Sequence, residues 1–191
     1  TGGIASGKST VTGSLRQQGY QVIDADQVVH ELQEPGERLY QALLSAFGPA
    51  ILQEDGRLDR LKLGAMIFGN PQLLEQSSQI QNQIIREELA GRRDLLAEKE
   101  DIFFMDLPLL FELGYETWFD QVWLVDVTEE TQLSRLMARN DLSQEEAEKR
   151  IAAQLSLQEK RNRADVLIDN NGLLELTQEQ LREALQKLER R

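Results

Sequence analysis

The chain has 191 residues, 40% of them apolar, which suits one compact domain with a smaller appended lobe. Its 33 acidic residues outnumber 21 basic ones, and the resulting charge of −12 argues against general attraction to nucleic acid or anionic membranes. It contains no cysteine and one histidine, which excludes disulfides, thiolate catalysis and cysteine-based zinc sites. No apolar run reaches the roughly 18 residues of a membrane span, and no signal-peptide pattern is present. We therefore expect a cytoplasmic protein.

The first ten residues, TGGIASGKST, contain the spacing Gly2-x-x-x-x-Gly7-Lys8-Ser9 of a P-loop. In such a loop, backbone N–H groups converge on phosphate oxygens, and the helix that follows presents the positive end of its dipole. We expect Lys8 to reach the β- and γ-phosphates of ATP and the Ser9 hydroxyl to ligate Mg²⁺. The alternative is a flexible glycine turn with an exposed lysine. The predicted helix directly after Gly7 favours the P-loop.

The segment after the loop has the pattern of a strand–helix unit. A helix is predicted from Lys8 to Gln18, stopped by Gly19, and a short apolar strand follows over 20–23. This strand leads into Asp24-Ala25-Asp26. The strand that should precede a P-loop is missing from the sequence, so we expect the source protein to have residues before Thr1.

The remaining segments predict a helical lobe inserted between strands. Residues 27–100 are predicted to be mostly helical, with glycine and proline breaks at 35–36, 47–49, 55–56 and 70–71. The apolar runs at 102–105 and 122–127 predict strands buried on both faces, as in a parallel sheet.

The last third alternates helices with one more strand. Thr128 begins a predicted helix, and Ser143 with Glu146 predicts a capping box at the start of another. A last strand is predicted at 166–168, before an amphipathic C-terminal helix. This alternation predicts an α/β three-layer fold.

A cluster of basic residues between Arg135 and Arg163 predicts a lid. Seven basic residues stand against five acidic ones here, a net charge of +2 in a chain of −12. A kinase of small molecules needs such positive charge, because it shields and stabilises the transferring phosphoryl group. An ordinary solvated pair of charged helices is the alternative for any one of these residues. The guanine-recognition pattern Asn-Lys-x-Asp of GTPases does not occur in the sequence.

Several longer motifs resemble those of one kinase family. They are TGGIASGKST, VIDADQVVHEL, DGRLDR, DLPLLFE, RNDLSQEEAEKRIAAQ and ADVLIDNNG. Their order and spacing across essentially the whole chain resemble the dephospho-CoA kinase family. The resemblance implies transfer of the ATP γ-phosphate to the ribose 3′-hydroxyl of dephospho-CoA. It also implies a P-loop kinase-like fold that has a parallel sheet, a helical acceptor-binding lobe and a helical lid.

The resemblance also divides the chain. It implies a nucleotide-binding core at residues 1–26, 101–139 and 164–191. It also implies a helical CoA-side domain at 27–100 and a lid at 140–163.

The resemblance assigns roles to individual positions. The nucleotide would bind at Gly2, Gly3, Ile4, Ala5, Ser6, Gly7, Lys8, Ser9 and Thr10, with the loop Asn170-Asn171-Gly172 near the adenine. The acceptor would be bound by Asp26, Arg60, Pro108, Leu109, Leu110 and Glu112. The catalytic residues would be Asp26, Lys8 and Arg139.

Asp26 follows a predicted strand, where a carboxylate faces the ligand crevice of an α/β sheet and can orient or deprotonate a hydroxyl group. The alternative for Asp26 is a helix N-cap. Asp106 is expected either to act on Mg²⁺ through a water molecule or simply to end its strand. The lone His30 is interpreted as an exposed or half-packed helix residue.

The sequence departs from the family at one place and leaves two other functions open. Many members carry a His-Pro pair shortly before an arginine, where this chain has Asn82-Gln83 before Arg86. A kinase of another small hydroxyl or nucleotide acceptor would share the loop and the lid, and a nucleotide-binding switch would bind ATP without turnover. We expect a small-molecule partner, no nucleic acid or membrane partner, and a monomer or weak homo-oligomer.

Overall fold

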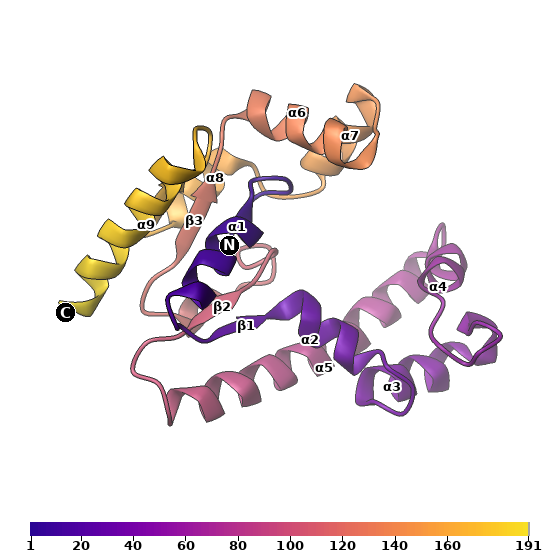
Figure 1. Cartoon of the computed structure of the whole chain (residues 1–191). Coiled ribbons are helices and arrows are strands. Elements are labelled where there is room, and N and C mark those ends of the chain that lie inside the picture. Colours follow the sequence, from indigo (N-terminus) through magenta and orange to yellow (C-terminus); the bar gives the residue numbers. More distant parts are fainter. Residues whose placement is uncertain (191) are drawn as a thin grey trace. The chain divides into compact units, whose positions relative to one another are not determined.

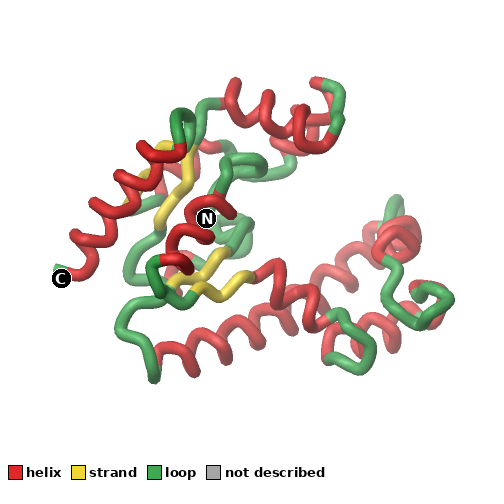
Figure 2. Tube along the Cα trace, in the orientation of Figure 1, coloured by secondary structure: helices red, strands yellow, loops and turns green. Residues whose placement is uncertain are grey.

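A computed structural model describes residues 1–190 of the chain. Helices account for most of these residues, and each strand is only three or four residues long (Figure 2). The chain divides into two compact units, the first comprising Thr1–Val22 with Asp106–Arg191 and the second Ile23–Met105. The second unit begins and ends within a few residues of the expected helical domain, whereas residues 140–163 belong to the first unit. No described helix is both long and apolar enough to cross a membrane.

The first unit carries the P-loop, the helix that follows it, and the helices of the last third of the chain (Figure 1). Its elements are α1 (Lys8–Gln17), the 3-10 helix η2 (Glu116–Trp118), β3 (Trp123–Asp126), α6 (Glu129–Asn140), α7 (Gln144–Ala152), α8 (Leu157–Arg163), β4 (Val166–Asp169) and α9 (Leu174–Glu189).

Strand β3 is the centre of this unit's sheet. It pairs in parallel with β4, from Trp123 opposite Val166 to Asp126 opposite Asp169. Gly2 forms a parallel bridge with Val125, and the Val125 N–H donates to the Thr1 carbonyl oxygen at 2.9 Å. The expectation of parallel pairing is therefore confirmed for this unit. The P-loop begins directly beside β3.

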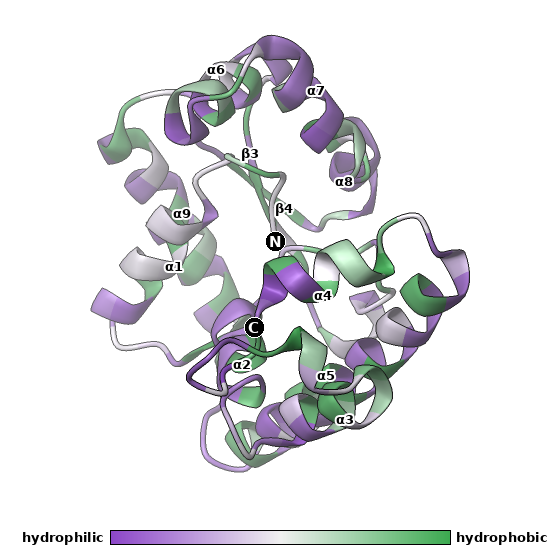
Figure 3. Cartoon of the chain, turned by 90° about the vertical axis from the view of Figure 1, so that its right-hand side faces the viewer, coloured by the Kyte–Doolittle hydropathy of each residue, from purple (hydrophilic) through white to green (hydrophobic). Residues whose placement is uncertain are grey.

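Helices α1 and α9 supply the core that supports this sheet. Leu124 and Val125 of β3 are buried, as the continuous apolar run predicts. Helix α9 contacts both β4 and α1, and its Leu181 and Leu185 are almost fully buried. Burying one such leucine contributes about 1.5–3 kcal/mol, so this packing holds α1 and the P-loop before it in place. Helix α7 is largely hydrophilic, as the purple ribbon in Figure 3 shows.

The second unit is built on one long helix. Its elements are β1 (Val22–Asp24, which starts at the unit boundary), α2 (Ala25–Leu32), α3 (Arg38–Phe47), the 3-10 helix η1 (Pro49–Ile51), α4 (Arg60–Ile67), α5 (Pro71–Ala97) and β2 (Phe104–Asp106, which ends at the boundary). Helix α5 contacts α2, α3 and α4. The residues at its start favour a helix N-terminus. The Asn70 side chain accepts from the Leu73 N–H, and Pro71 has no backbone N–H that would need a hydrogen-bond acceptor.

The described strands form two two-stranded sheets, β1 with β2 and β3 with β4. Each strand lies within two residues of its predicted place: β1 is shifted from 20–23 to Val22–Asp24, and β2 from 102–105 to Phe104–Asp106. The capping box at Ser143 is confirmed, since Ser143 and Glu146 satisfy each other's N–H groups at the start of α7.

Candidate functional site

The P-loop has the backbone that phosphate binding requires. Gly7 directly precedes α1 with φ 86°, a left-handed conformation in which a side chain is strained. A Cβ atom on Gly7 would also collide with the Asn170 side-chain nitrogen. Because the first N–H groups of α1 have no acceptor within the helix, the end of the loop presents free donors where an anion can bind.

Three side chains from other segments hold the loop by its backbone. The Asn170 Nδ2 donates to the Ser6 carbonyl oxygen at 2.8 Å, and the Gln132 Nε2 donates to the Ile4 carbonyl oxygen at 2.9 Å. The Ile4 N–H in turn donates to the Gln154 Oε1 at 2.9 Å. These three partners lie far from the loop in the sequence, so the loop's own residues give no indication of them.

Lys8 is paired with a carboxylate at the end of β2. Its Nζ lies 2.5 Å from the Asp106 Oδ1, and the Asp106 side chain is only 4% exposed. Asp106 does end its strand as predicted, but it also holds the lysine beside the loop. Sequence reasoning missed this pairing. The Asp106 Oδ1 makes no hydrogen bond within the described residues, so the ion pair alone offsets its burial.

In the second unit, the two acidic residues at the start of α2 have different roles. Asp24 is the N-cap, and its Oδ1 accepts from the N–H groups of Asp26 at 3.0 Å and Gln27 at 3.2 Å. The interpretation of Asp26 as the N-cap is therefore wrong. The Asp26 side chain is exposed in the first turn of α2, and no described residue forms a hydrogen bond or an ion pair with its carboxylate.

Arg60 lines a cavity of about 490 Å³ in the same unit. The cavity is also lined by His30, Arg57, Asp59 and Leu61, and the Arg60 Nη2 lies 3.2 Å from the His30 Nδ1. Since His30 follows Asp26 by four residues in α2, the two side chains share one face of the helix. The exposed position predicted for His30 is confirmed. The structure thus places Arg60 in a hollow beside His30, and His30 lies one helical turn after Asp26.

Most of the segment 108–112 is buried or half-buried, so little of it is exposed to contact a substrate. Leu110 is only 3% exposed, and Leu109 is the most exposed of the apolar residues in this segment. The Glu112 Oε1 accepts from the Leu155 N–H at 3.0 Å and lies 2.8 Å from the Nζ of the fully buried Lys160. Pro108 contributes its carbonyl oxygen to the Thr1 hydroxyl at 3.4 Å. Glu112 thereby supports the turn before α8, next to Gln154.

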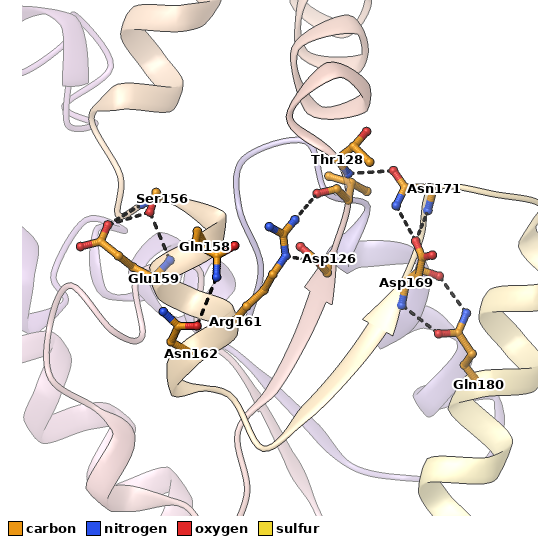
Figure 4. A network of polar contacts seen from close by, with 11 residues as sticks. Asp126, Thr128, Ser156, Gln158, Glu159, Arg161, Asn162, Asp169, Asn171 and Gln180 are labelled. Atoms are coloured by element: carbon orange, nitrogen blue, oxygen red, sulfur yellow. Dashed lines mark hydrogen bonds and ion pairs between the residues drawn. The ribbon is translucent and has the colours of Figure 1, made fainter.

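Several basic residues of the predicted lid form structural ion pairs. Arg161 donates to the Asp126 Oδ2 at 2.7 Å, a contact drawn in Figure 4, and to the Val127 carbonyl oxygen at 2.9 Å. This hydrogen bond to Asp126 raises the pKa of Arg161. Arg163 pairs with Glu116. For these residues, and for Lys160, the structure shows a local partner that the charge pattern alone did not reveal.

The two arginines of α6 are placed differently. Arg139 is exposed, and its Nε donates to the Asn140 Oδ1 at 2.9 Å. The Arg135 Nη1 lies 3.8 Å from the position that a Cβ atom on Gly7 would occupy, which places its guanidinium beside the P-loop. Sequence reasoning counted Arg135 only as one charge among seven. Its spacing of four residues from Arg139 on one helix face was the available signal.

The loop after β4 connects three elements. Asn170 is buried, and its side chain is shared between the Ser6 carbonyl oxygen and the Thr177 hydroxyl. The Asn171 Oδ1 accepts from the Thr128 N–H at 2.8 Å, and its Nδ2 donates to Asp169, as Figure 4 shows. The pair therefore joins β4, the P-loop and the start of α6. Their proximity to an adenine stays a prediction.

Known proteins of one family match this chain over nearly its whole length. The dephospho-CoA kinase family model matches residues 1–175. The dephospho-CoA kinase of Streptococcus pyogenes is 60% identical over 188 residues, covering 98% of this chain and 95% of that protein. That of Streptococcus mutans is 58% identical over 189 residues, covering 99% and 96%.

Two solved structures are also similar to this chain over nearly its whole length. A crystal structure of a Thermus thermophilus protein superposes with a TM-score of 0.81 at 35% identity, covering 98% of this chain and 94% of that one. The dephospho-CoA kinase of Campylobacter jejuni superposes with a TM-score of 0.75 at 27% identity, covering 98% and 94%. The shared fold, the extent of the family match and the identity to named relatives together mean that this chain belongs to the dephospho-CoA kinase family.

Proposed function

We propose that this protein transfers the γ-phosphoryl group of ATP to the ribose 3′-hydroxyl of dephospho-CoA, which yields CoA and ADP. The observation that carries the proposal is the P-loop, whose left-handed Gly7 opens the amino end of α1 and whose Lys8 is held at Asp106. Family membership supplies the acceptor, because the named relatives are dephospho-CoA kinases.

The loop residues would bind and orient the ATP phosphates. N–H groups at the start of α1 would donate to phosphate oxygens, and the Lys8 ammonium would exchange part of its contact with Asp106 for a phosphate. A bound Mg²⁺ would neutralise charge that develops on the transferring phosphoryl group. The exposed Ser9 hydroxyl, an oxygen donor in the first turn of α1, fits that ion. The described residues contain no cluster of three metal-binding side chains, but Mg²⁺ needs few protein ligands when phosphates supply the others.

We propose Asp26 as the group that orients the acceptor hydroxyl and accepts its proton late in the transfer. A carboxylate without a hydrogen-bond donor is available as an acceptor, and Asp24 already provides the N-cap that α2 needs. The cavity beside Arg60 would bind a more remote part of dephospho-CoA, whose diphosphate suits a guanidinium. Pro108, Leu109, Leu110 and Glu112 remain candidates for the CoA side, chiefly through the exposed Leu109.

Arg139 is proposed to stabilise the transferring phosphoryl group, because it is exposed and its only described partner is the neighbouring Asn140. Breaking this short surface contact would cost little, so the side chain is free to reorient toward bound substrate. Asn170, Asn171 and Gly172 are proposed to line the adenine site through their backbone, since both asparagine side chains are engaged within the protein.

The proposal is tested by a coupled assay of ADP release, with CoA identified by mass spectrometry. We expect turnover with dephospho-CoA and at most trace turnover with nucleosides or sugar acids at equal concentration. Efficient turnover of another acceptor would transfer the assignment to that substrate. ATP binding without turnover of any acceptor would favour a nucleotide-binding switch. We also propose a cytoplasmic location. We further propose a monomeric or weakly associating state, and size-exclusion chromatography with light scattering would measure that state.

A further inference from the structure

Ala5 has a left-handed backbone conformation inside the P-loop. Its φ is 60°, a region that glycine adopts freely but that lowers the population of a residue with a Cβ atom by about 5- to 30-fold. The Ser6 N–H donates to the Gly3 carbonyl oxygen at 3.1 Å, so Ala5 is the third residue of a tight four-residue turn, a place where glycine is usual when φ is positive. Such a conformation persists only where the surrounding structure holds it.

The conformation of Ala5 suits the binding of an anion by the loop. Gly7, two residues later, is also left-handed, with φ 86°. Left-handed residues that alternate with ordinary ones direct successive backbone N–H groups toward one point, and such a concave group of donors binds phosphate. If Ala5 left this conformation, the donors after it would no longer converge.

Two glutamine side chains hold the peptide groups on the amino side of Ala5. The Gln132 Nε2 donates to the Ile4 carbonyl oxygen at 2.9 Å, and the Ile4 N–H donates to the Gln154 Oε1 at 2.9 Å. The Ile4 carbonyl group belongs to the peptide bond that enters Ala5, and the Ser6 N–H, bonded to Gly3, belongs to the one that leaves it. Since both peptide planes are held, the φ of Ala5 is held with them.

The two glutamines come from different helical segments. Gln132 lies in α6, is 3% exposed, and packs so closely on Gly3 that a Cβ atom there would lie 2.6 Å from its Nε2. Gln154 is half-buried and lies between α7 and α8, in the segment predicted to be the lid. The next residue, Leu155, is fixed there because its N–H donates to the Glu112 Oε1 at 3.0 Å. Gln154 therefore joins the P-loop to the base of the predicted lid.

We propose that Gln154, together with Gln132, is a positioning residue that keeps Ala5 left-handed and thereby keeps the P-loop ready to bind nucleotide. The apparent affinity for a ligand falls in proportion to the fraction of protein in the binding-competent state. The seating of the predicted lid segment against Ile4 thus raises the affinity for ATP. This inference rests on the proposed function only in its nucleotide, and not in its acceptor.

The first test separates this role from a general loss of structure. Gln154→Ala should raise the Kd and the KM for ATP by about 5- to 30-fold, the population that the left-handed conformation loses without support. The kcat at saturating ATP should change by less than about threefold, because bound phosphates then hold the loop themselves. Partial unfolding would instead lower kcat and leave the Kd unchanged. Gln144→Ala, at the exposed start of α7, is the matched control and should bind ATP within about twofold of the wild type.

The second test uses the opposite directions of the two hydrogen bonds. Gln154→Glu keeps an oxygen that accepts from the Ile4 N–H, whereas Gln132→Glu sets a carboxylate against the Ile4 carbonyl oxygen. Both variants add one negative charge beside the loop, so the difference between them measures the hydrogen bond. Gln154→Glu should bind ATP at least about fivefold more tightly than Gln132→Glu. Should Gln132→Glu not fold by circular dichroism, Gln154→Glu should still bind ATP more tightly than Gln154→Ala.

The third test asks whether the glutamines act through Ala5. In an Ala5→Gly background, Gln154→Ala should weaken ATP binding by less than about threefold, because glycine adopts this φ without support. An equal loss in both backgrounds, an unchanged Kd in Gln154→Ala, or equal binding by the two glutamate variants would each overturn the inference. A wild-type protein that binds ATP but leaves dephospho-CoA unphosphorylated would refute the proposed acceptor only, whereas failure to bind ATP would refute both proposals.

Discussion

Replacing Gly7 by alanine should damage both the stability of the first unit and its nucleotide binding. The backbone there has φ 86°, which costs a residue with a Cβ about 1–2 kcal/mol. The added methyl group would also collide with the Asn170 side chain, whose Nδ2 holds the Ser6 carbonyl oxygen at 2.8 Å. Losing that buried hydrogen bond costs about a further 1–3 kcal/mol.

Together these effects predict that Gly7→Ala lowers the free energy of unfolding by about 2–5 kcal/mol. A domain of typical stability, about 5–15 kcal/mol, would still be mostly folded, so ATP binding can be measured on the variant. We expect that binding to be lost, because Asn170 can move only by releasing the loop. Urea unfolding at equilibrium measures the first effect, and calorimetric titration with ATP measures the second.

Gly13→Ala is the matched control. Gly13 lies within α1, and a Cβ atom there would meet nothing within 4 Å. Alanine is the better helix former by about 1 kcal/mol, so this variant should be slightly stabilised and should bind ATP normally. If Gly7→Ala were as stable as the wild type and bound ATP with unchanged affinity, the account of the loop conformation would be refuted.

Three further substitutions, with Asp24→Asn as a comparison for one of them, test the proposed chemistry. Lys8→Ala should abolish turnover while the protein remains folded, as checked by thermal unfolding; loss of folding with normal activity in the folded fraction would make Lys8 structural. Asp26→Asn should keep ATP binding and near-native melting but lower kcat by about 100-fold or more, whereas Asp24→Asn, which retains a capping side chain, should do less; the opposite order would mean that the catalytic carboxylate is Asp24. Arg139→Ala should lower kcat more than it changes affinity for dephospho-CoA in steady-state assays, and an unchanged kcat would assign the role to another lid residue.

The sequence by itself determined the features that depend on neighbouring residues. A glycine spacing followed by a helix predicted the P-loop, and the capping box at Ser143 was readable because both partners lie within four positions. The buried run around β3 likewise predicted a parallel strand. Hydrogen bonds and apolar periodicity of this kind form within one element, so local spacing is enough to predict them.

Only the tertiary structure decided which side chains meet across the chain. Gln132 and Asn170 hold the loop from more than a hundred residues away, and nothing in the spacing of either residue indicates its partner. Asp24 rather than Asp26 caps α2, although both aspartates suit that role in sequence. Arg135 rather than Arg139 lies beside Gly7, because the anchoring of α6 at Ile4 selects which turn of the helix reaches the loop. Such choices depend on how packed elements are placed in space, and residue type alone does not encode that placement.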